Sequence, residues 1–241
     1  YLFGINRIRA RARLLLNLED EAANGTRDDT AALALPVSLQ AFAHTADAVT
    51  RRPALPGNQI EMLHNGDAAY PEMLAAIDNA QHSIWLTTYI FRRDKIGRAF
   101  ADALGAAVRR GVEVRVLIDG VGACYGFSFP TTMLRLRKVR AVRFLPPRLI
   151  PPMLHINLRN HRKLLVVDGS VAFTGGINIA AYHQLSDVRV RKPVADVHFR
   201  VRGPVVAQLA MTFAEDWRMA AREMLRLPPA PAPLEHGAVC R

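Results

Sequence analysis

The spacing of hydrophobic and polar positions changes several times along the chain, and each change predicts a secondary-structure element. Short runs rich in Val, Ile, Leu, Thr and aromatic residues predict strands. Apolar stripes at helical spacing, such as Phe100, Leu104 and Val108, predict helices. We expect strands at 59–63, 83–91, 112–118, 139–145, 164–167, 171–174 and 196–201, and helices at 67–80, 94–110, 131–138, 179–185 and 204–227.

The order of these elements predicts an α/β fold. Strands alternate with helices from residue 58 onward, a pattern typical of a sheet covered on both faces. We therefore expect a mixed, largely parallel sheet flanked by helices on both faces. Ligands of such sheets bind beyond the carboxyl ends of the strands. Tyr89 and Asp119 lie near predicted strand ends, where each either contacts a substrate or only caps or packs.

Proline, glycine and charge patterns divide the chain into three parts. Residues 1–57 begin with an apolar, arginine-rich stretch at 1–18, which predicts either the cytoplasmic flank of a membrane segment or a basic amphipathic helix. Residues 58–227 carry the α/β pattern. Residues 228–241 begin with a proline–alanine run and predict a tether. The apolar, proline-rich segment 146–154 predicts either a lipid-facing lid or a packed crossover loop.

The composition favours partners that carry phosphate. The 241 residues include 32 Lys and Arg against 21 Asp and Glu, which gives a net charge of +11. Such a charge fits nucleic acid or anionic lipid headgroups and does not choose between them. Cys124 and Cys240 lie far apart in a chain with no metal-binding spacing, so we expect no metal and no cofactor. No uninterrupted apolar stretch is long enough to span a bilayer.

The stretch from residue 160 to residue 178 predicts a β-hairpin. The apolar run 164–167 is typical of a buried strand, and 171–174 is the return strand. Between them, Asp168-Gly169 predicts a two-residue turn, because both residue types tolerate positive φ.

The residues at the two ends of this hairpin form a candidate site for an anionic phosphorus centre. His161 and Lys163 lie two positions apart and so point to the same face of the strand. Asn178 follows Gly175 and Gly176, which allow backbone to come close to a ligand. A fixed cation and an amide would stabilise charge on phosphoryl oxygens, and the imidazole would attack or donate a proton.

The complete spacing is His-x-Lys, four residues, Asp, six residues, then Gly-Gly-x-Asn. It resembles the signature of the phospholipase D superfamily, which includes bacterial cardiolipin synthases. Segments 65–71, 119–122 and 157–161 are similar to cardiolipin synthases in particular. The chain is therefore most similar to the N-terminal half of a bacterial cardiolipin synthase.

This resemblance implies roles for individual residues. His161 would be the nucleophile that forms a phosphohistidine, and Lys163 and Asn178 would bind the phosphoryl oxygens. Asp168 matches the aspartate of the motif, and its place in the turn suggests mainly structural work. Asp196, on a later strand, is the candidate for orienting the nucleophilic histidine; its alternative is an ion pair with an arginine. The substrate-binding candidates are Gly175, Gly176 and Asp119.

The superfamily places two such motifs opposite each other, whereas this chain contains one. The resemblance therefore implies a second His-x-Lys motif, from a homodimer mate or from a C-terminal half outside this sequence. It also implies phosphatidyl transfer on an anionic phospholipid such as phosphatidylglycerol, at the cytoplasmic face of the cytoplasmic membrane. Two alternatives stay open: a homodimeric phosphodiesterase that cuts nucleic acid, and a non-catalytic half that binds anionic membranes or nucleic acid through its arginines.

Overall fold

A computed structural model describes residue 45 and residues 52–122, 130–146 and 159–240. Leu55–Cys240 form one compact unit, which contains every strand below. The expectations for segment 1–18 and for most of segment 146–154 fall outside the described residues. The elements in chain order are β1 (Leu55–His64), α3 (Asn65–Asn79), β2 (Ser83–Thr88), α4 (Lys95–Arg109), β3 (Glu113–Asp119), α5 (Pro130–Arg135), β4 (Arg140–Phe144), β5 (Leu164–Val167), β6 (Val171–Gly175), the 3-10 helix η2 (Ala181–His183), β7 (Val197–Arg202), α6 (Val205–Ala221) and β8 (Ala238–Cys240).

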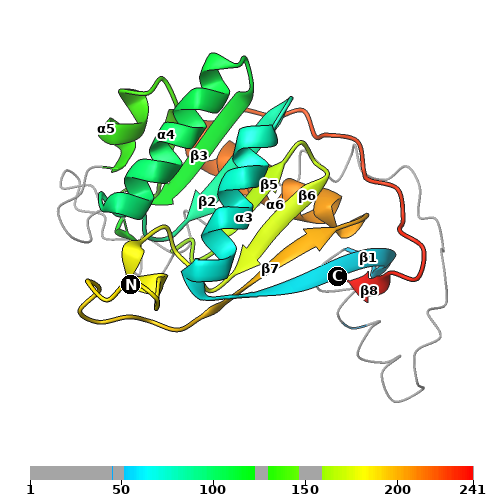
Figure 1. The fold of residues 1–241 in the computed structure, drawn as a ribbon. Coiled ribbons are helices and arrows are strands. Elements are labelled where there is room, and N and C mark those ends of the chain that lie inside the picture. The colour runs from blue at the N-terminus through cyan, green and yellow to red at the C-terminus, as the bar shows by residue number, and fades with distance from the viewer. Residues whose placement is uncertain (1–44, 46–51, 123–129, 147–158, 241) are drawn as a thin grey trace, which may run out of the picture. The chain divides into compact units, whose positions relative to one another are not determined.

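The eight strands form one mixed sheet in the order β4-β3-β2-β5-β6-β7-β1-β8 (Figure 1). Only the pairs β2–β3 and β3–β4 are parallel; β5 runs antiparallel to β2, and the remaining pairs are antiparallel too. The mixed α/β class is confirmed, but the expectation of a largely parallel sheet was wrong. The strand that follows β4 in the sequence, β5, lies next to β2 and runs antiparallel to it. From there each strand runs antiparallel to the one before it, β6 to β5 and β7 to β6.

Helices cover both faces of the sheet, as the sequence predicted (Figure 1). The alternation in β5 decides which residue faces which side: Leu165 and Val167 join the core under α3 and α4, whereas Leu164 and Val166 join the core under α6. Trp217 of α6 is completely buried in that second core. Burial on both faces makes β5 a continuous apolar run, and it fixes the register of the strand that follows Lys163.

The β5–β6 turn holds three residues, 168–170, where the sequence predicted two. Asp168 and Gly169 both have positive φ, as expected for this turn. The carboxylate of Asp168 accepts hydrogen bonds of 2.8 Å from the backbone N–H groups of Gln81, His82 and Ser83. These bonds attach the turn to the start of β2 and satisfy donors that the strand leaves unpaired.

Several predicted boundaries were wrong. The strand expected at 83–91 ends at Thr88, and the helix expected at 179–185 is only the 3-10 turn η2. Helix α6 ends at Ala221 because Arg222 adopts a left-handed conformation. Within the 228–241 segment, whose role as a tether stays a prediction, Pro228 lies next to Gly169 and β8 pairs with β1. The division into three parts itself stays a prediction.

Two further points concern a membrane-spanning helix and a metal-binding cluster among the described residues. In the described part of the chain, no helix is long and apolar enough to cross a membrane. Among the same residues, no three His, Cys, Asp or Glu side chains are grouped so that they could hold a metal ion.

Candidate functional site

The candidate site lies at one edge of the sheet, formed by the ends of the central strands. Polar residues that directly precede or follow these strands meet there. β2 and β3 end at this edge, β5 begins there, β6 ends there and β7 begins there. A parallel bridge between Phe91 and Ile179 joins the segments that follow β2 and β6. Residues that are up to about a hundred positions apart in the sequence therefore meet at this edge.

His161 and Lys163 lie side by side directly before β5. The Lys163 Nζ atom is 3.0 Å from His161 Nδ1 and donates to the His161 carbonyl oxygen at 2.8 Å. An ammonium group only donates hydrogen bonds, so Nδ1 accepts here and a neutral ring carries its proton on Nε2. His161 is exposed, whereas Lys163 is only 7 % exposed. The pair thus presents a reachable imidazole on a nearly buried cation.

The electrostatics of this pair favour a neutral imidazole. Desolvation lowers the pKa of His161, and the Lys163 charge lowers it further, while Asp119 acts in the opposite direction. Burial also lowers the pKa of Lys163, against the charge of Asp196. A neutral imidazole retains a lone pair, which is the form that a nucleophile or a general base requires.

Tyr89 supports both members of the pair. Its ring centroid lies 4.3 Å from that of His161, with 38° between the ring planes, and the Lys163 Nζ lies 5.6 Å from the centroid of Tyr89. An aromatic face favours a cation and restricts the rotation of a ring packed against it. The sequence left open whether Tyr89 contacts a substrate or only caps or packs; the structure places it against the imidazole.

Asn178 is held by bonds to every one of its polar groups. Its side-chain oxygen accepts from Ile90 N at 3.1 Å, and its amide nitrogen donates to Tyr182 Oη at 3.3 Å. The backbone N–H of Asn178 donates to His183 Nε2 at 3.2 Å, and His183 Nδ1 lies 3.1 Å from the Val194 oxygen. These partners require the Nδ1–H tautomer of His183. Tyr182 and His183 therefore fix the orientation of Asn178.

The two glycines of the motif make room for Asp196. A Cβ at Gly176 would fall on the carboxylate of Asp196, and a Cβ at Gly175 would meet the backbone and ring of His198. In the structure these glycines make room for Asp196 and His198, and their role in binding a substrate stays a prediction. Asp196 accepts from Val197 N at 2.8 Å and raises the pKa of Lys163 through its charge. Among the described contacts, none joins Asp196 to His161.

His198, on β7 two positions after Asp196, is a buried residue that sequence analysis did not select. It is 1 % exposed, and within the described part of the chain neither ring nitrogen has a hydrogen-bond partner. Burial lowers its pKa to about 4, although the charge of Asp196 acts in the opposite direction. The ring is thus neutral at neutral pH.

Two buried carboxylates anchor the residues on either side of His161. Asp119 Oδ2 accepts from Asn160 N at 3.0 Å. Asp216 Oδ2 accepts from the Asn160 side chain at 2.7 Å and from Arg162 Nη1 at 2.7 Å. The chain is therefore tied down one residue before and one residue after the imidazole.

Asp216, Asn160 and Arg162 were missed by the sequence analysis. A signal for Asp216 did exist: it lies between Phe213 and Trp217 on the buried stripe of α6. A carboxylate at such a position is rare unless it has partners. Burial raises the pKa of Asp216, and Arg162 and Asn160 oppose that rise.

The structure thus brings together His161, Lys163, Asn178, Asp196 and both glycines at one edge, with Asp119 beside them. Asp168 is the exception, because it lies at the opposite end of β5, where its carboxylate accepts from the backbone of residues 81–83 at and just before the start of β2. The catalytic and binding roles of these residues stay predictions.

A mixed α/β sheet with His-x-Lys before one strand and Gly-Gly-x-Asn after the next defines the class of phospholipase-D-like domains. A family model described as "Cardiolipin synthase, PLD-like domain" matches residues 73–217. The match covers more than half of the chain, and the chain belongs to this family. The predicted membership of the phospholipase D superfamily is confirmed, as is the similarity to the N-terminal half of a bacterial cardiolipin synthase.

Curated relatives agree with the family model. Cardiolipin synthase A of Pseudomonas putida (strain GB-1) is 34% identical over 193 residues, which are 80% of this chain and 40% of that protein. Cardiolipin synthase of Geobacillus kaustophilus is 34% identical over 180 residues, 75% of this chain and 36% of that protein. The chain thus spans about 40% of the length of the curated relatives it matches.

Solved structures share the fold at low sequence identity. The phospholipase D family member Nuc of Salmonella typhimurium superposes with a TM-score of 0.52 and 18% identity, covering 70% of this chain and 99% of Nuc. Phosphatidylserine synthase of Haemophilus influenzae gives a TM-score of 0.53 and 16% identity, covering 70% of this chain and 39% of that one.

Proposed function

We propose that this chain is one half of a phosphatidyltransferase active site that works through a phosphohistidine at His161. The substrate is an anionic phospholipid of the phosphatidylglycerol type, presented at the cytoplasmic face of the cytoplasmic membrane. The product of the complete reaction is cardiolipin, as the names of the curated relatives suggest.

The observation that supports this proposal most is the meeting of His161, Lys163 and Asn178 at one edge of the sheet. The imidazole is neutral and exposed, and the ammonium lies 3.0 Å from it. A phosphoryl oxygen would compete with His161 Nδ1 for the Lys163 ammonium and would accept from the Asn178 amide. These donors would stabilise the charge that develops on the phosphoryl oxygens in the transition state.

The reaction consists of two displacements at phosphorus. In the first, the lone pair of His161 attacks phosphorus, the bond to the glycerol oxygen breaks, and a general acid protonates that oxygen as glycerol leaves. In the second, the hydroxyl of another phosphatidylglycerol attacks, its proton goes to the same acid–base group, and the bond between phosphorus and His161 breaks. The enzyme returns to its starting state.

The acid–base group of this scheme belongs to a second His-x-Lys motif. This chain contains one such motif and spans about 40% of its curated relatives. The second motif therefore comes from a homodimer mate or from the remainder of a longer protein. In either case His161 of this chain supplies the nucleophile.

An activated donor tests the nucleophile without the second motif. A phosphatidyl ester of p-nitrophenol releases its phenolate without needing a proton, so the first displacement can proceed when no general acid is present. We expect a burst of p-nitrophenolate of one equivalent per chain, and His161→Ala should abolish it. His82→Ala, which removes an exposed histidine of the α3–β2 turn, is the matched control and should retain the burst. A full burst from His161→Ala would refute the proposal.

A homodimeric phosphodiesterase that cuts nucleic acid is the second candidate. The net charge of +11 favours it, and so does the alignment with 99% of the Nuc chain, a protein of about one such domain. Plasmid cleavage and phosphatidyl transfer measured on the same preparation, each with His161→Ala beside it, distinguish the two. Cleavage without lipid transfer would favour the phosphodiesterase; absence of both, together with absence of the p-nitrophenolate burst, would favour a binding module.

A further inference from the structure

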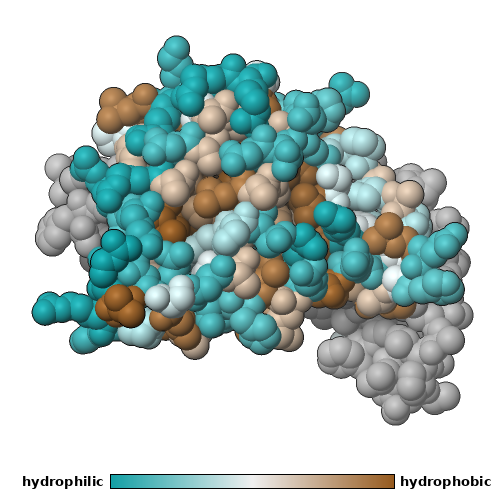
Figure 2. Space-filling view, in the orientation of Figure 1, coloured by the Kyte–Doolittle hydropathy of each residue, from teal (hydrophilic) through white to brown (hydrophobic). Residues whose placement is uncertain are grey.

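The loop from Leu185 to Val194, between η2 and β7, exposes apolar and cationic side chains together. Val188 is 96% exposed, and Leu185 and Val194 are 41% and 45% exposed. Arg189, Arg191 and Lys192 are exposed within the same ten residues. In Figure 1 this loop runs along the lower left edge of the domain, and Figure 2 shows hydrophobic and hydrophilic surface next to each other at that edge.

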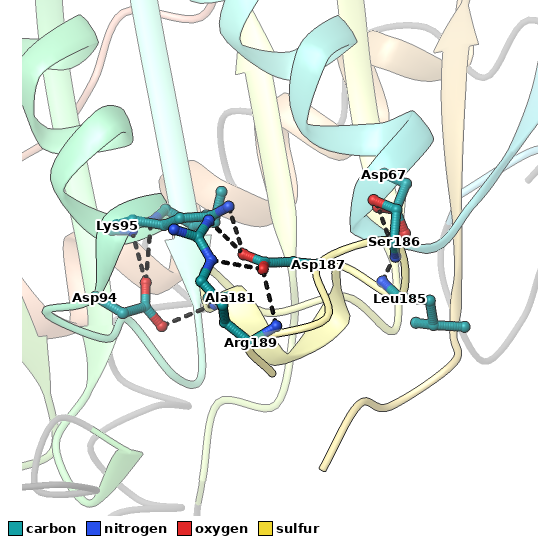
Figure 3. Close-up of polar contacts among 10 residues, drawn as sticks. Asp67, Asp94, Lys95, Ala181, Leu185, Ser186, Asp187 and Arg189 are labelled. Carbon is teal, nitrogen blue, oxygen red and sulfur yellow. Dashed lines mark hydrogen bonds and ion pairs between the residues drawn. The ribbon is translucent and has the colours of Figure 1, made fainter. Parts of the chain in front are cut away.

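Hydrogen bonds to two carboxylates hold this loop in a defined conformation (Figure 3). Asp67 at the start of α3 accepts from Leu185 N at 2.7 Å and from the hydroxyl and backbone N–H of Ser186. Asp187 accepts from Lys95 Nζ at 2.7 Å and from the Arg189 guanidinium at 2.9 Å. Arg189 and Lys95 hold the pKa of Asp187 far below its usual range. Asp67 lies at the start of the helix predicted at 67–80, and its carboxylate binds this loop.

The apex of the loop is a turn that leaves Val188 almost fully exposed among the described residues. Val190 N donates to the backbone carbonyl oxygen of Asp187 at 2.9 Å, which closes the turn around Val188 and Arg189. Val194 N donates to the backbone carbonyl oxygen of Tyr182 at 2.8 Å and closes the base of the loop. Turn positions favour Gly, Pro, Asn, Asp and Ser. A β-branched apolar residue fixed at such an apex gains nothing from the fold, and its burial requires another surface.

The base of the loop belongs to the candidate site. Tyr182 and His183, directly before it, bond to Asn178. The Arg92 guanidinium lies 5.9 Å from the centroid of the Tyr182 ring and adds a cation between the loop and the site. A surface that receives the loop would therefore also lie next to the edge that carries Asn178 and His161.

We propose that the 185–194 loop docks the domain on an anionic bilayer, with Val188 inserted into the interface and Arg191 and Lys192 against lipid phosphates. Apolar side chains that enter the boundary between headgroups and acyl chains, flanked by cations that meet anionic lipids, are the usual elements of such docking. The choice of a bilayer rests on the proposed function, because a lipid phosphate must reach His161. Docking through the loop would hold the site at the level of the lipid headgroups, where the phosphate of the substrate lies.

Insertion is tested with a tryptophan at the apex. Val188→Trp should shift its emission to shorter wavelength with vesicles of phosphatidylglycerol and phosphatidylcholine, because Trp85 and Trp217 are already buried and change little. Leu136→Trp is the matched control: Leu136 is 80% exposed and lies between Arg135 and Arg137, next to α5. Its emission should stay unchanged. No shift at position 188, equal shifts at both positions, or a shift at position 188 with duplex DNA but not with vesicles would overturn the proposal.

Affinity provides a second, independent measurement. Val188→Ser should weaken binding to the same vesicles about tenfold or more, because the burial of one valine is lost. Leu136→Ser should bind like the wild type. The p-nitrophenolate burst with a short-chain donor below its micelle concentration should be the same in both variants. Loss of the burst in the wild type would refute the proposed function while leaving the docking result unaffected; wild-type vesicle affinity of Val188→Ser would refute the docking.

Discussion

The replacement Asp216→Asn tests whether the anchors of His161 act on catalysis. It keeps the shape of the side chain and removes its charge. In the wild type, both carboxylate oxygens of Asp216 accept from Arg162, at 2.9 and 2.7 Å, and one also accepts from Asn160 at 2.7 Å. An amide has one accepting oxygen, so its NH₂ group must face either Arg162 or Asn160, both of which are donors.

The structure sets the expected magnitude for stability. A hydrogen bond to a charged group contributes about 1.5–3 kcal/mol. The Arg162 side chain is 52% exposed and regains water when the ion pair is lost, which keeps the cost below that of a fully buried pair. Burial already raises the pKa of Asp216, so the neutral amide also avoids a desolvation penalty. We expect the free energy of unfolding to fall by about 1–2 kcal/mol.

The effect on activity should be larger than the effect on stability. Asn160 and Arg162 flank His161, and a displacement of the imidazole by about 1 Å can slow a displacement reaction about a hundredfold. We expect the p-nitrophenolate burst of Asp216→Asn to slow by about 10- to 100-fold in protein that is still folded. Urea unfolding of the same preparation verifies that the protein is folded and measures the loss of stability.

Glu223→Gln is the control for a general effect of a lost carboxylate. Glu223 lies just after the C-terminus of α6 and bonds to Arg115 of β3, Arg140 of β4 and Trp217; none of its described hydrogen bonds or ion pairs involves Asn160 or Arg162, which flank the imidazole. It should lose similar stability and keep the wild-type burst rate. Equal slowing in both variants, or a wild-type rate in Asp216→Asn, would refute the idea that Asp216 positions the imidazole.

Three further outcomes follow from the structure. Asp168→Ala should lower the free energy of unfolding by about 2–4 kcal/mol, because three backbone N–H donors lose their acceptor and alanine disfavours positive φ. The p-nitrophenolate burst of the folded fraction should stay unchanged. Urea titration and burst kinetics measure the two effects. His198 has a pKa of about 4 in the folded chain and about 6.5 when unfolded, so the unfolded state binds an extra proton between these values and stability falls by about 3 kcal/mol as the pH falls through this window. Urea titrations at several pH values should show a smaller loss for His198→Gln; equal slopes would contradict the assignment. The burst rate should decline only below about pH 6.5, because burial and Lys163 lower the pKa of His161, and Lys163→Gln should move this decline to higher pH.

The sequence predicted the elements that depend on local pattern. The hairpin of β5 and β6 follows from an uninterrupted apolar run and from an Asp-Gly pair that tolerates positive φ. Helix α4 follows from its apolar stripe and from Asp94, whose carboxylate accepts from Ile96 N and Gly97 N. His161 and Lys163 are only two positions apart, so their proximity was predictable, but both lie just before β5 and the predicted alternation along a strand does not apply to them.

Contacts between distant segments were beyond the sequence pattern. The direction of β5 depends on the path of the chain between β4 and β5, which hydrophobic spacing does not encode, so the largely parallel sheet was wrong. Asp67 resembles a helix cap locally, yet it binds Leu185, 118 positions away. The bonds of Asn160 to Asp216 likewise join residues 56 positions apart. A polar side chain that could bond equally well to a nearby or to a distant backbone group cannot be given its hydrogen-bond partner from sequence spacing alone.

The central claim is that the imidazole of His161 carries the phosphatidyl group. The most direct measurement uses the p-nitrophenyl ester with a labelled phosphate, a quench in mild alkali after one turnover, and peptide mapping of the retained label. The account predicts one label per chain on the peptide that contains His161, and none in His161→Ala. Label on another residue, or a burst of p-nitrophenolate in His161→Ala equal to that of the wild type, would contradict it.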